Sequence, residues 1–529
     1  MKHDFSKGAF VGIELGSTRI KAVLTDSAYS PAASGEYVWE NKYENGYWTY
    51  SLEDIHRGLR GCFLQLTENA REIGITADKF TAMGISAMMH GYMAFDSEDN
   101  LLTPFRTWRN TTAARAAAEM SERLRFNIPA RWSSAHLYQA VLDGEEHLQR
   151  LCHVTTLAGY INYRLTGDRS VGIGEASGIF PVKDGDYDNE RLEIFGKMLR
   201  EKGFDIDPRQ LFPPVKRAGD RGAGAFLTKE GADFIDPDGI TGIKPGLPLC
   251  PPEGDAGTGM TATNAVLPGT GNISAGTSVF AMLVTDKPLK KVHPEIDMVT
   301  TPDGTPAAMV HCNNCCSELD AWVNMFGEFA GLIGADIDRS SLYKTLYSKA
   351  MSADPSCSGV CACNFLSAEP TAGAEKGSPM YFRTPGSSLD LGTFFRAQLY
   401  SAAAALKMGM DILFTEENIK AEEFTGHGGF FKLPFAGGQI MADALGTNLS
   451  LMTTAGEGGA WGMALLAAYM INGKGKTLPQ WLNTEVFADS KKTTLTPDRS
   501  GREGFEKFME RFKAGLAAQK AAGEASERK

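Results

Sequence analysis

The sequence predicts an α/β protein that is built from two or more domains. Short apolar runs that suit strands alternate with longer segments of helical periodicity, and this alternation is typical of the α/β class. The chain has 529 residues, which is too many for one compact core. Two strand–turn–strand patterns, at residues 11–24 and 271–284, lie about half a chain apart. They are weak evidence for two related domains, because their flanking sequences differ.

The first half of the chain opens with strands and continues with alternating elements. "FVGIEL" and "RIKAVLT" predict two strands around the polar turn of Gly16, Ser17 and Thr18. Residues 52–72 carry apolar side chains at helical spacing and predict a helix. "FTAMGISAM" predicts a buried strand, and the Ala-rich "TTAARAAAEMSERLR" predicts another helix.

The second half repeats this kind of pattern. "GNISAGTSVFAMLV" predicts two strands around a Gly-Thr-Ser turn, and long helices are predicted at 391–413 and 457–473. From about Lys491 the chain is charged and Ala-rich, which predicts a peripheral helix with a frayed end. We therefore expect an N-terminal domain at 1–268, a C-terminal domain at 269–490 and a tail at 491–529.

Composition excludes some classes of function. The net charge of −11 argues against nucleic acid as the main partner. The first ten residues are polar, so no signal peptide is predicted, and no apolar segment approaches the length of a membrane span. We expect a cytoplasmic protein with no membrane partner. Nine cysteines, an odd number, fit reduced thiols better than a disulfide framework.

The stretch at residues 251–278 is the densest in groups that could carry chemistry. Glu253 and Asp255 lie in a Gly-rich turn, where a carboxylate can take a proton from a substrate hydroxyl. Glycines around it allow backbone N–H groups to approach phosphate oxygens. Phosphoryl transfer needs these parts together with a carboxylate that anchors Mg²⁺. Taken alone, the stretch is more simply explained as a surface loop with an Asx-turn at Asp255.

The stretch is one of a series of pieces that occur in a shared order along most of the chain. They are "GIELGSTRIKAVL", "GISAMMHG", "RTWRNTTA", "LAGYINYRLTGD" with "GEASGIF", "EGDAGTGMTATNAV", "SAGTSVF", "GHGGFFKLPFAGGQIMADALG" and "EGGAWGMALLAA". In this order they resemble the FGGY carbohydrate kinases, and xylulokinases among them. The resemblance implies two ribonuclease-H-like domains of the actin and hexokinase type, with a cleft between them.

The resemblance also implies a role for each matching residue. Asp255 would be the general base, and Glu14 would act through Mg²⁺. The residues that would bind ATP are Gly16, Ser17, Thr18, Gly276, Thr277, Ser278, Gly428 and Gly429. The residues that would contact the sugar are Met89, His90, Trp108, Arg109 and Asn110. The implied activity is ATP-dependent phosphorylation of a ketopentose such as xylulose or ribulose, and a homodimer is left open.

The chain departs from the family pattern at its site. The Asp that usually opens the first phosphate turn is Glu14 here, one methylene longer. The Gln of the family's Gln-Met-His-Gly segment is Met88, and its Trp-Asn-Asp has become Trp-Arg-Asn with Arg109. These changes touch the sugar pocket and the metal site. They leave open an actin-like ATPase, or a degenerate relative that binds nucleotide without phosphorylating sugar.

Two further features admit more than one interpretation. The cysteines in "HCNNCCSELDAW" and "CSGVCACNF" could bind zinc, but their spacing favours buried thiols that pack as small hydrophobes. Trp48, in an aromatic cluster after the first turn, could cover a face of the sugar. A simple anchoring role on a strand is somewhat favoured for it.

Overall fold

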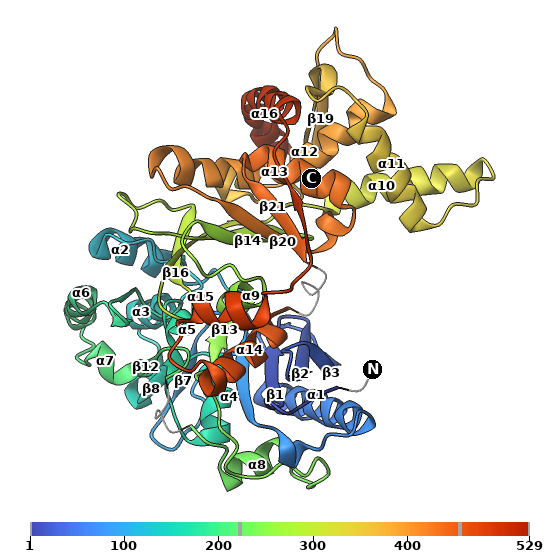
Figure 1. The fold of residues 1–529 in the computed structure, drawn as a ribbon. Coiled ribbons are helices and arrows are strands. Elements are labelled where there is room, and N and C mark those ends of the chain that lie inside the picture. The colour runs from blue at the N-terminus through green and yellow to red at the C-terminus, as the bar shows by residue number, and fades with distance from the viewer. Residues whose placement is uncertain (1–2, 221–224, 453–457, 527–529) are drawn as a thin grey trace. The chain divides into compact units, whose positions relative to one another are not determined.

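The computed structural model describes residues 3–220, 225–452 and 458–526 (Figure 1). The chain forms two compact units that interleave along the sequence. The first unit contains residues 1–267, 297–307 and 457–490, and the second contains 268–296, 308–456 and 491–529. The domain boundaries expected at residues 268 and 490 stay a prediction.

The first unit is built on a five-stranded sheet with the strand order β13-β6-β1-β2-β3. These strands are β1 (Phe10–Leu15), β2 (Arg19–Thr25), β3 (Pro31–Val38), β6 (Ala82–Ala87) and β13 (Glu253–Gly254). β1 pairs antiparallel with β2 and parallel with β6, and β6 pairs parallel with β13. The carboxyl ends of β1, β6 and β13 therefore lie at one edge of the sheet, where parallel sheets place their sites.

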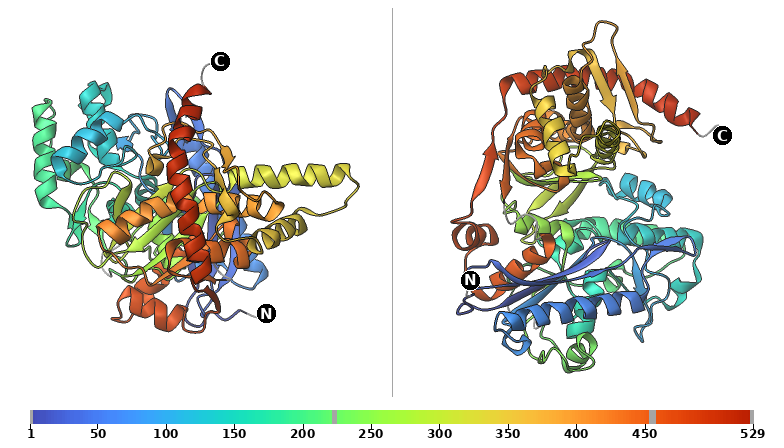
Figure 2. Two further views of the ribbon diagram at one scale, coloured as in Figure 1. Left: turned by 90° about the horizontal axis from the view of Figure 1, so that it is seen from above. Right: turned by 90° about the vertical axis from the view of Figure 1, so that its right-hand side faces the viewer.

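Two long helices pack on this sheet. α1 (Leu52–Glu72), the blue helix in Figure 2, contacts β2 and β3, and its N-cap Ser51 accepts the N–H of Asp54. α14 (Gly458–Asn472) contacts β1, β2 and β6. Gly12 permits this contact, because a Cβ there would lie 2.0 Å from the carbonyl oxygen of Ala460. Both helices occupy the positions predicted from the sequence.

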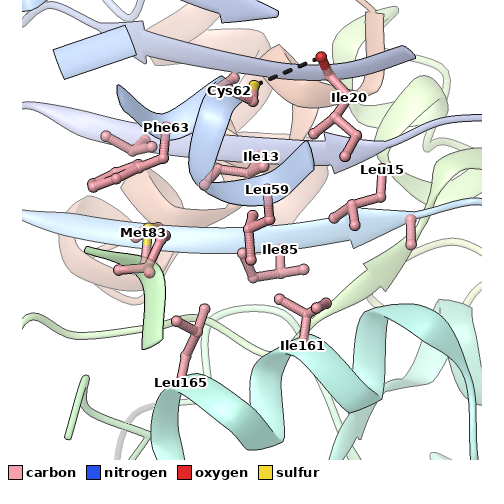
Figure 3. Close-up of a cluster of buried hydrophobic side chains, with 14 of the residues drawn as sticks. Ile13, Leu15, Ile20, Leu59, Cys62, Phe63, Met83, Ile85, Ile161 and Leu165 are labelled. Carbon is pink, nitrogen blue, oxygen red and sulfur yellow. Dashed lines mark hydrogen bonds between the residues drawn. The ribbon is translucent and has the colours of Figure 1, made fainter. Parts of the chain in front are cut away.

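An apolar core fills the space between the sheet and its helices (Figure 3). Side chains from β1, β2, β6, α1 and α4 (Leu157–Thr166) meet there without exposure to solvent. The residues labelled in the figure are Ile13, Leu15, Ile20, Leu59, Cys62, Phe63, Met83, Ile85, Ile161 and Leu165. The core fixes the strands whose ends carry the predicted site.

The remaining elements of the first unit are shorter. The helices are α2 (Ala114–Leu124), α3 (Ser133–Asp143), α5 (Ile173–Ala176), α6 (Asn189–Glu201), α7 (Pro208–Leu211), α8 (Lys229–Ile235), α9 (Asp255–Ala262) and α15 (Leu478–Trp481). The strands are β4 (Lys42–Glu44), β5 (Tyr47–Thr49), β7 (Met93–Phe95), β8 (His153–Thr155), β9 (Val171–Gly172), β10 (Val182–Lys183), β11 (Asp186–Tyr187) and β12 (Val215–Lys216).

The second unit has a sheet of related topology. Its strands include β14 (Thr270–Ala275), β15 (Val279–Val284), β20 (Glu423–His427) and β21 (Asn448–Met452), in the order β15-β14-β20-β21. β14 pairs antiparallel with β15 and parallel with β20, as β1 does with β2 and β6. The two predicted polar turns therefore occupy equivalent places in two sheets, which supports the expectation of related domains.

Further elements complete the second unit. The helices are α10 (Ser317–Leu332), α11 (Arg339–Met351), α12 (Leu391–Asp411), α13 (Gln439–Leu445) and α16 (Arg499–Ala525). The remaining strands are β16 (Ile296–Thr300), which runs on into the first unit, β17 (Pro306–Cys312), β18 (Val360–Cys363), β19 (Met380–Arg383) and β22 (Lys492–Leu495). The helix predicted for the tail is confirmed as α16, which buries Phe505, Phe508 and Phe512. The expected frayed end, 527–529, lies outside the described residues.

Three findings bear on the expectations about membrane spans and cysteines. None of the helices in the described residues is long and apolar enough to cross a membrane. All nine cysteines are free thiols, and all but Cys152 are buried. Within the described ranges no group of three or more His, Cys, Asp or Glu side chains could hold a metal ion. The cysteines therefore fit the interpretation of packed thiols rather than a zinc site.

Candidate active site

The turn between β1 and β2 is held rigidly by aromatic side chains. The indole N–H of Trp39 donates to the carbonyl of Gly16 at 2.7 Å, and the Tyr50 hydroxyl donates to the carbonyl of Ser17. The indole N–H of Trp108 donates to the Ser17 hydroxyl at 2.9 Å. Thr18 at the tip is exposed. The turn is thus pre-organised, with its tip free to meet a ligand.

Glu14 lies just before this turn, at the N-terminus of α14. Its carboxylate accepts the backbone N–H of Ala460 at 3.2 Å. A Cβ at Gly459 would lie only 2.6 Å from the carboxylate, so the helix end approaches closely because that residue has no side chain. Burial, and then the negative charge of Asp255, raise the pKa of Glu14 to about 7. Glu14 and Asp255 are therefore neighbours in an environment of low polarity.

Asp255 is the first residue of α9 and follows β13 directly. It is partly exposed, and one of its carboxylate oxygens accepts the backbone N–H of Met89 at 3.1 Å. Burial raises the pKa of Asp255, which makes it a stronger base than a free aspartate. The structure thus brings together Asp255, Glu14 and Met89, which are far apart in the sequence.

His90 is held by a strained backbone beside Met89. Its φ is 72°, in the left-handed region that side chains rarely adopt. Its Nδ1 lies 3.2 Å from the carbonyl of Gly178, to which it donates, and its ring stacks on Trp132. Burial lowers the pKa of His90 well below its usual value, so the imidazole is neutral. Strain of this kind concentrates at functional sites.

Within the segment from Trp108 to Asn110, the side chains of Asn110 and Arg109 have different surroundings. The Asn110 side chain is fully engaged, since its amide bonds the backbone of Trp48 and Thr107 at 2.8 to 2.9 Å. This saturation argues that Asn110 shapes the segment rather than contacting a sugar. Arg109 is exposed, and its guanidinium lies 3.9 Å from the ring centroid of Trp48.

The second unit holds its own polar turn by the start of α10. The backbone N–H groups of Cys316 and Cys315 donate to the carbonyls of Gly276 and Thr277, at 2.9 and 3.0 Å. Thr277 is exposed and Ser278 is half-buried, whereas in the first turn Ser17 is half-buried and Thr18 is exposed.

Two consecutive glycines, Gly428 and Gly429, follow β20 in the second unit. Gly428 has a φ of 106°, and a Cβ there would lie 2.3 Å from the Ala275 carbonyl. A Cβ at Gly429 would meet nothing within 4 Å. Gly428 can therefore lie close to the end of β14 only because it has no side chain. Gly429, in contrast, borders open space. The roles implied for both units stay predictions.

Some residues of the site were not singled out by sequence reasoning. Glu175 on α5 is wholly buried near Asp255, and the backbone N–H of Ala460 binds Glu14. Glu253 was noted only as a neighbour of Asp255, yet it is buried and accepts N–H groups from α5. Glu175 and Glu253 lie in sequence segments that the family resemblance includes. Their burial could not be predicted, because it depends on contacts between segments that are distant in the sequence. A separate cavity of about 700 Å³, lined by residues such as Tyr163, includes none of the predicted site residues.

Comparison with known proteins now identifies the class. Residues 9–222 match the N-terminal domain of the FGGY family of carbohydrate kinases, and residues 271–471 match its C-terminal domain. The chain belongs to the FGGY family of carbohydrate kinases. It is therefore a sugar kinase, a class for which ATP is the expected phosphoryl donor.

Individual relatives are distant but extend along the whole chain. A xylulose kinase of Haemophilus influenzae is 20% identical over 95% of this chain and 98% of its own length. The solved structure of a xylulose kinase from Rhodospirillum rubrum superposes with a TM-score of 0.77, at 18% identity, and covers 96% of this chain and 98% of that one. A gluconate kinase from Lactobacillus acidophilus has a TM-score of 0.77 at 17% identity, with 98% and 99% covered. The structural matches establish the fold of two actin- and hexokinase-like domains.

Proposed function

We propose that the protein transfers the γ-phosphoryl group of Mg-ATP to a hydroxyl of a ketopentose such as xylulose or ribulose. The observation that carries this proposal is the position of Asp255. Its carboxylate is partly exposed at the start of α9, is oriented by the N–H of Met89 and lies near Glu14. A base beside a second carboxylate and a rigid polar turn is the arrangement that phosphoryl transfer requires.

Asp255 would take the proton of the attacking hydroxyl. Burial raises its pKa, which strengthens it as a base. The hydrogen bond from Met89 orients the carboxylate, and its partial exposure would let a sugar hydroxyl reach it. Orientation of this kind supplies much of the rate enhancement in phosphoryl transfer.

The residues present fit a magnesium ion. Mg²⁺ prefers oxygen ligands and is commonly held by one or two carboxylates together with substrate phosphates. Glu14 and Asp255 are two neighbouring carboxyls: burial, and then the negative charge of Asp255, raise the pKa of Glu14. Glu14 would hold the ion directly or through water. When bound, the ion supplies positive charge that offsets the charge of the transferring phosphoryl group.

Backbone groups of the two polar turns would bind the phosphates of ATP. Ser17 and Thr18 belong to one turn, and Thr277 and Ser278 to the other. Each turn is fixed by hydrogen bonds from other segments, so little reorganisation accompanies binding. Gly428 and Gly429 would lie along the nucleotide.

The choice of a ketopentose rests on the full-length likeness to a xylulose kinase, at low identity. The test is a screen of sugar-dependent ADP release across pentuloses, hexuloses and polyols, with a control that lacks sugar. We expect a pentulose to give the highest kcat/KM. A preference for another sugar would correct the substrate, whereas ADP release without dependence on any sugar would favour a degenerate ATPase.

A further inference from the structure

One buried carboxyl near the active site has no part in the mechanism described above. Glu175 on α5 has no exposed surface, and within the described residues neither of its carboxyl oxygens has a hydrogen-bond partner of ordinary geometry. Burial has the largest effect on its pKa and raises it well above the usual value, while the nearby Thr156 hydroxyl acts in the opposite direction. An unpaired buried carboxylate would be costly, so this side chain needs an explanation.

Glu175 lies directly behind the general base. A Cβ at Gly254, the residue just before Asp255, would be 2.5 Å from Oε2 of Glu175 and 2.8 Å from the Met89 side chain. The carboxyl group therefore occupies the space that the missing side chain at 254 leaves. The same space is bordered by the side chain of Met89, whose backbone N–H donates to Asp255.

Glu253 is a second buried carboxyl next to Glu175, and its hydrogen bonds differ from those of Glu175. Its carboxylate is also buried, but it accepts the backbone N–H of Glu175 at 2.9 Å and that of Gly174 at 3.4 Å. A Cβ at Gly172 or Gly174 would lie 2.1 or 2.4 Å from its oxygens, so these glycines make the room for it. Two N–H donors favour the ionised form of Glu253 over that of Glu175, which has none.

The other groups around Glu175 do not supply a counter-charge. Asp255 on α9 and Glu253 on β13 both disfavour its ionised form, and Thr156 precedes α4. The cation on the adjoining strand β12 is Lys216, which forms an ion pair with Asp168 at 2.6 Å. A charged Glu175 would thus face two carboxyls in an apolar interior, whereas a protonated one avoids this cost.

We propose that Glu175 is a positioning residue for Asp255: a neutral carboxylic acid that fills the space behind the base and leaves Asp255 as the group that ionises. This inference rests on the proposed role of Asp255. Glu175 keeps its own proton through the reaction, and it acts only through the packing and the field at its neighbour.

The protonation state is tested by infrared spectroscopy at pH 7, which requires no turnover. We expect the difference spectrum of wild type and Glu175→Gln to contain one carboxylic-acid C=O band, since other protonated carboxyls such as Glu253 contribute equally to both proteins. The matched control is Glu417→Gln, which removes another buried carboxyl, one that accepts N–H groups from Lys290 and Lys291 and pairs with His293. That control should lose carboxylate bands and keep the acid band. Loss of only carboxylate bands in Glu175→Gln would overturn the proposal.

The positioning role is tested by kinetics. Glu175→Ala should lower kcat on the order of tenfold with little change in the KM for ATP, since small displacements of a catalytic group are costly. Glu175→Gln should recover most of this loss, because it is neutral and of similar size. The acid limb of its pH profile for kcat/KM should coincide with that of the wild type.

Two outcomes would contradict the positioning role. The first is a glutamine variant that performs as poorly as alanine. The second is an acid limb of that variant that moves to lower pH, as expected if a charged Glu175 raises the pKa of Asp255 in the wild type. If Glu175→Gln does not fold, Glu175→Asp replaces it in the infrared test. That variant should shift the acid band rather than remove it. Failure of the sugar screen with a positive infrared result would refute the kinase assignment alone.

Discussion

At the scale of single residues, Arg109 is a position where the sequence departs from the family pattern that it resembles. It stands where the family pattern has Asn, and it is exposed with its guanidinium over Trp48. The pair forms a platform that combines an aromatic face with a fork of hydrogen-bond donors. The contact between Arg109 and Trp48 was not predicted, because the two residues are far apart in the sequence and only the fold brings them together.

We predict that Arg109→Asn changes the ranking of sugars by kcat/KM more than it changes the KM for ATP. Loss of the guanidinium removes several donors and leaves the Trp48 ring uncovered, and the relative values of kcat/KM should move several-fold, or about 1 kcal/mol. Steady-state kinetics across pentuloses and hexuloses measure this. Arg115→Asn, at another exposed arginine, is the control. An unchanged ranking would mean that Arg109 does not contribute to sugar choice.

Glu14 is predicted to couple magnesium binding to pH. Because its pKa is about 7, protons compete with the metal near neutrality, and the apparent affinity for Mg²⁺ should rise between pH 6 and 8. Glu14→Gln removes the charge, so turnover should fall and this pH dependence should weaken. Magnesium titrations of initial rate at several pH values measure it.

Glu14→Asp introduces the residue that the family pattern has at this position, and its turnover distinguishes two interpretations of the site. Slower turnover would show adjustment to the longer side chain, and faster turnover would favour the degenerate interpretation. A glutamine variant that matched wild type in rate and in magnesium response would remove Glu14 from the metal site.

At the scale of elements, the close contact of α14 with α9 and β1 positions the site. A Cβ at Gly462 would lie 2.0 Å from the carbonyl oxygen of Thr258 on α9. The same helix presents the N–H of Ala460 to Glu14. The sequence predicted this helix from its apolar run, but the glycines that let it approach other backbone could not be recognised without the fold.

We predict that Gly462→Ala destabilises the protein by about 1–3 kcal/mol, because the added methyl group forces two helices apart. Turnover should also fall, since α14 carries a hydrogen-bond donor to Glu14. Urea unfolding and kcat measure the two effects. Gly331→Ala is the control: that helical position on α10 has open space, so alanine should be neutral or slightly stabilising. Equal stability of both variants would show that the contact is not tight.

Prediction from sequence succeeded where periodicity is local and failed where contacts are distant. The helix predicted at 52–72 has those bounds in the structure, because its apolar spacing and N-cap are written in one continuous stretch. Asp255 could be proposed from its Gly-rich turn and its family resemblance. The environment of Glu175 could not be predicted from the sequence, because the groups around it come from α9, β13 and the segment before α4. The role of Asn110 was also hidden, since its partners lie near Trp48.

At the scale of the whole molecule, the two units repeat one arrangement of strands around a polar turn. Each sheet places an antiparallel hairpin next to a parallel strand, and the turn of the hairpin carries small polar residues. The first unit adds several buried carboxyls whose pKa values are raised, among them Glu14, Glu175 and Glu253. Their protons make stability depend on pH.

We predict that the protein loses stability as pH rises from 6.5 to 8. Burial raises the pKa of Glu253 from 4.5 to about 8, so the unfolded chain releases this proton above 4.5 while the folded chain keeps it. Its contribution is complete below pH 4.5 and is lost on the way to pH 8. Buried histidines with lowered pKa values, such as His136, act in the opposite direction only below about 6.5.

The expected loss over this interval is about 1–2 kcal/mol from Glu253, with further loss from Glu14 and Glu175. The urea midpoint measured in steps of pH reports it. A midpoint that stays constant or rises between pH 6.5 and 8 would show that these carboxyls are already ionised in the folded protein.

The measurement that tests the account most directly is phosphoryl transfer by Asp255→Asn. With γ-labelled ATP and the best sugar from the screen, wild-type protein should transfer label to the sugar, and the variant should be slower by about 10²–10⁴, since asparagine cannot accept the proton. ATP binding, measured separately, should change little. Transfer at a rate near that of the wild type would contradict the assignment of Asp255 as the base.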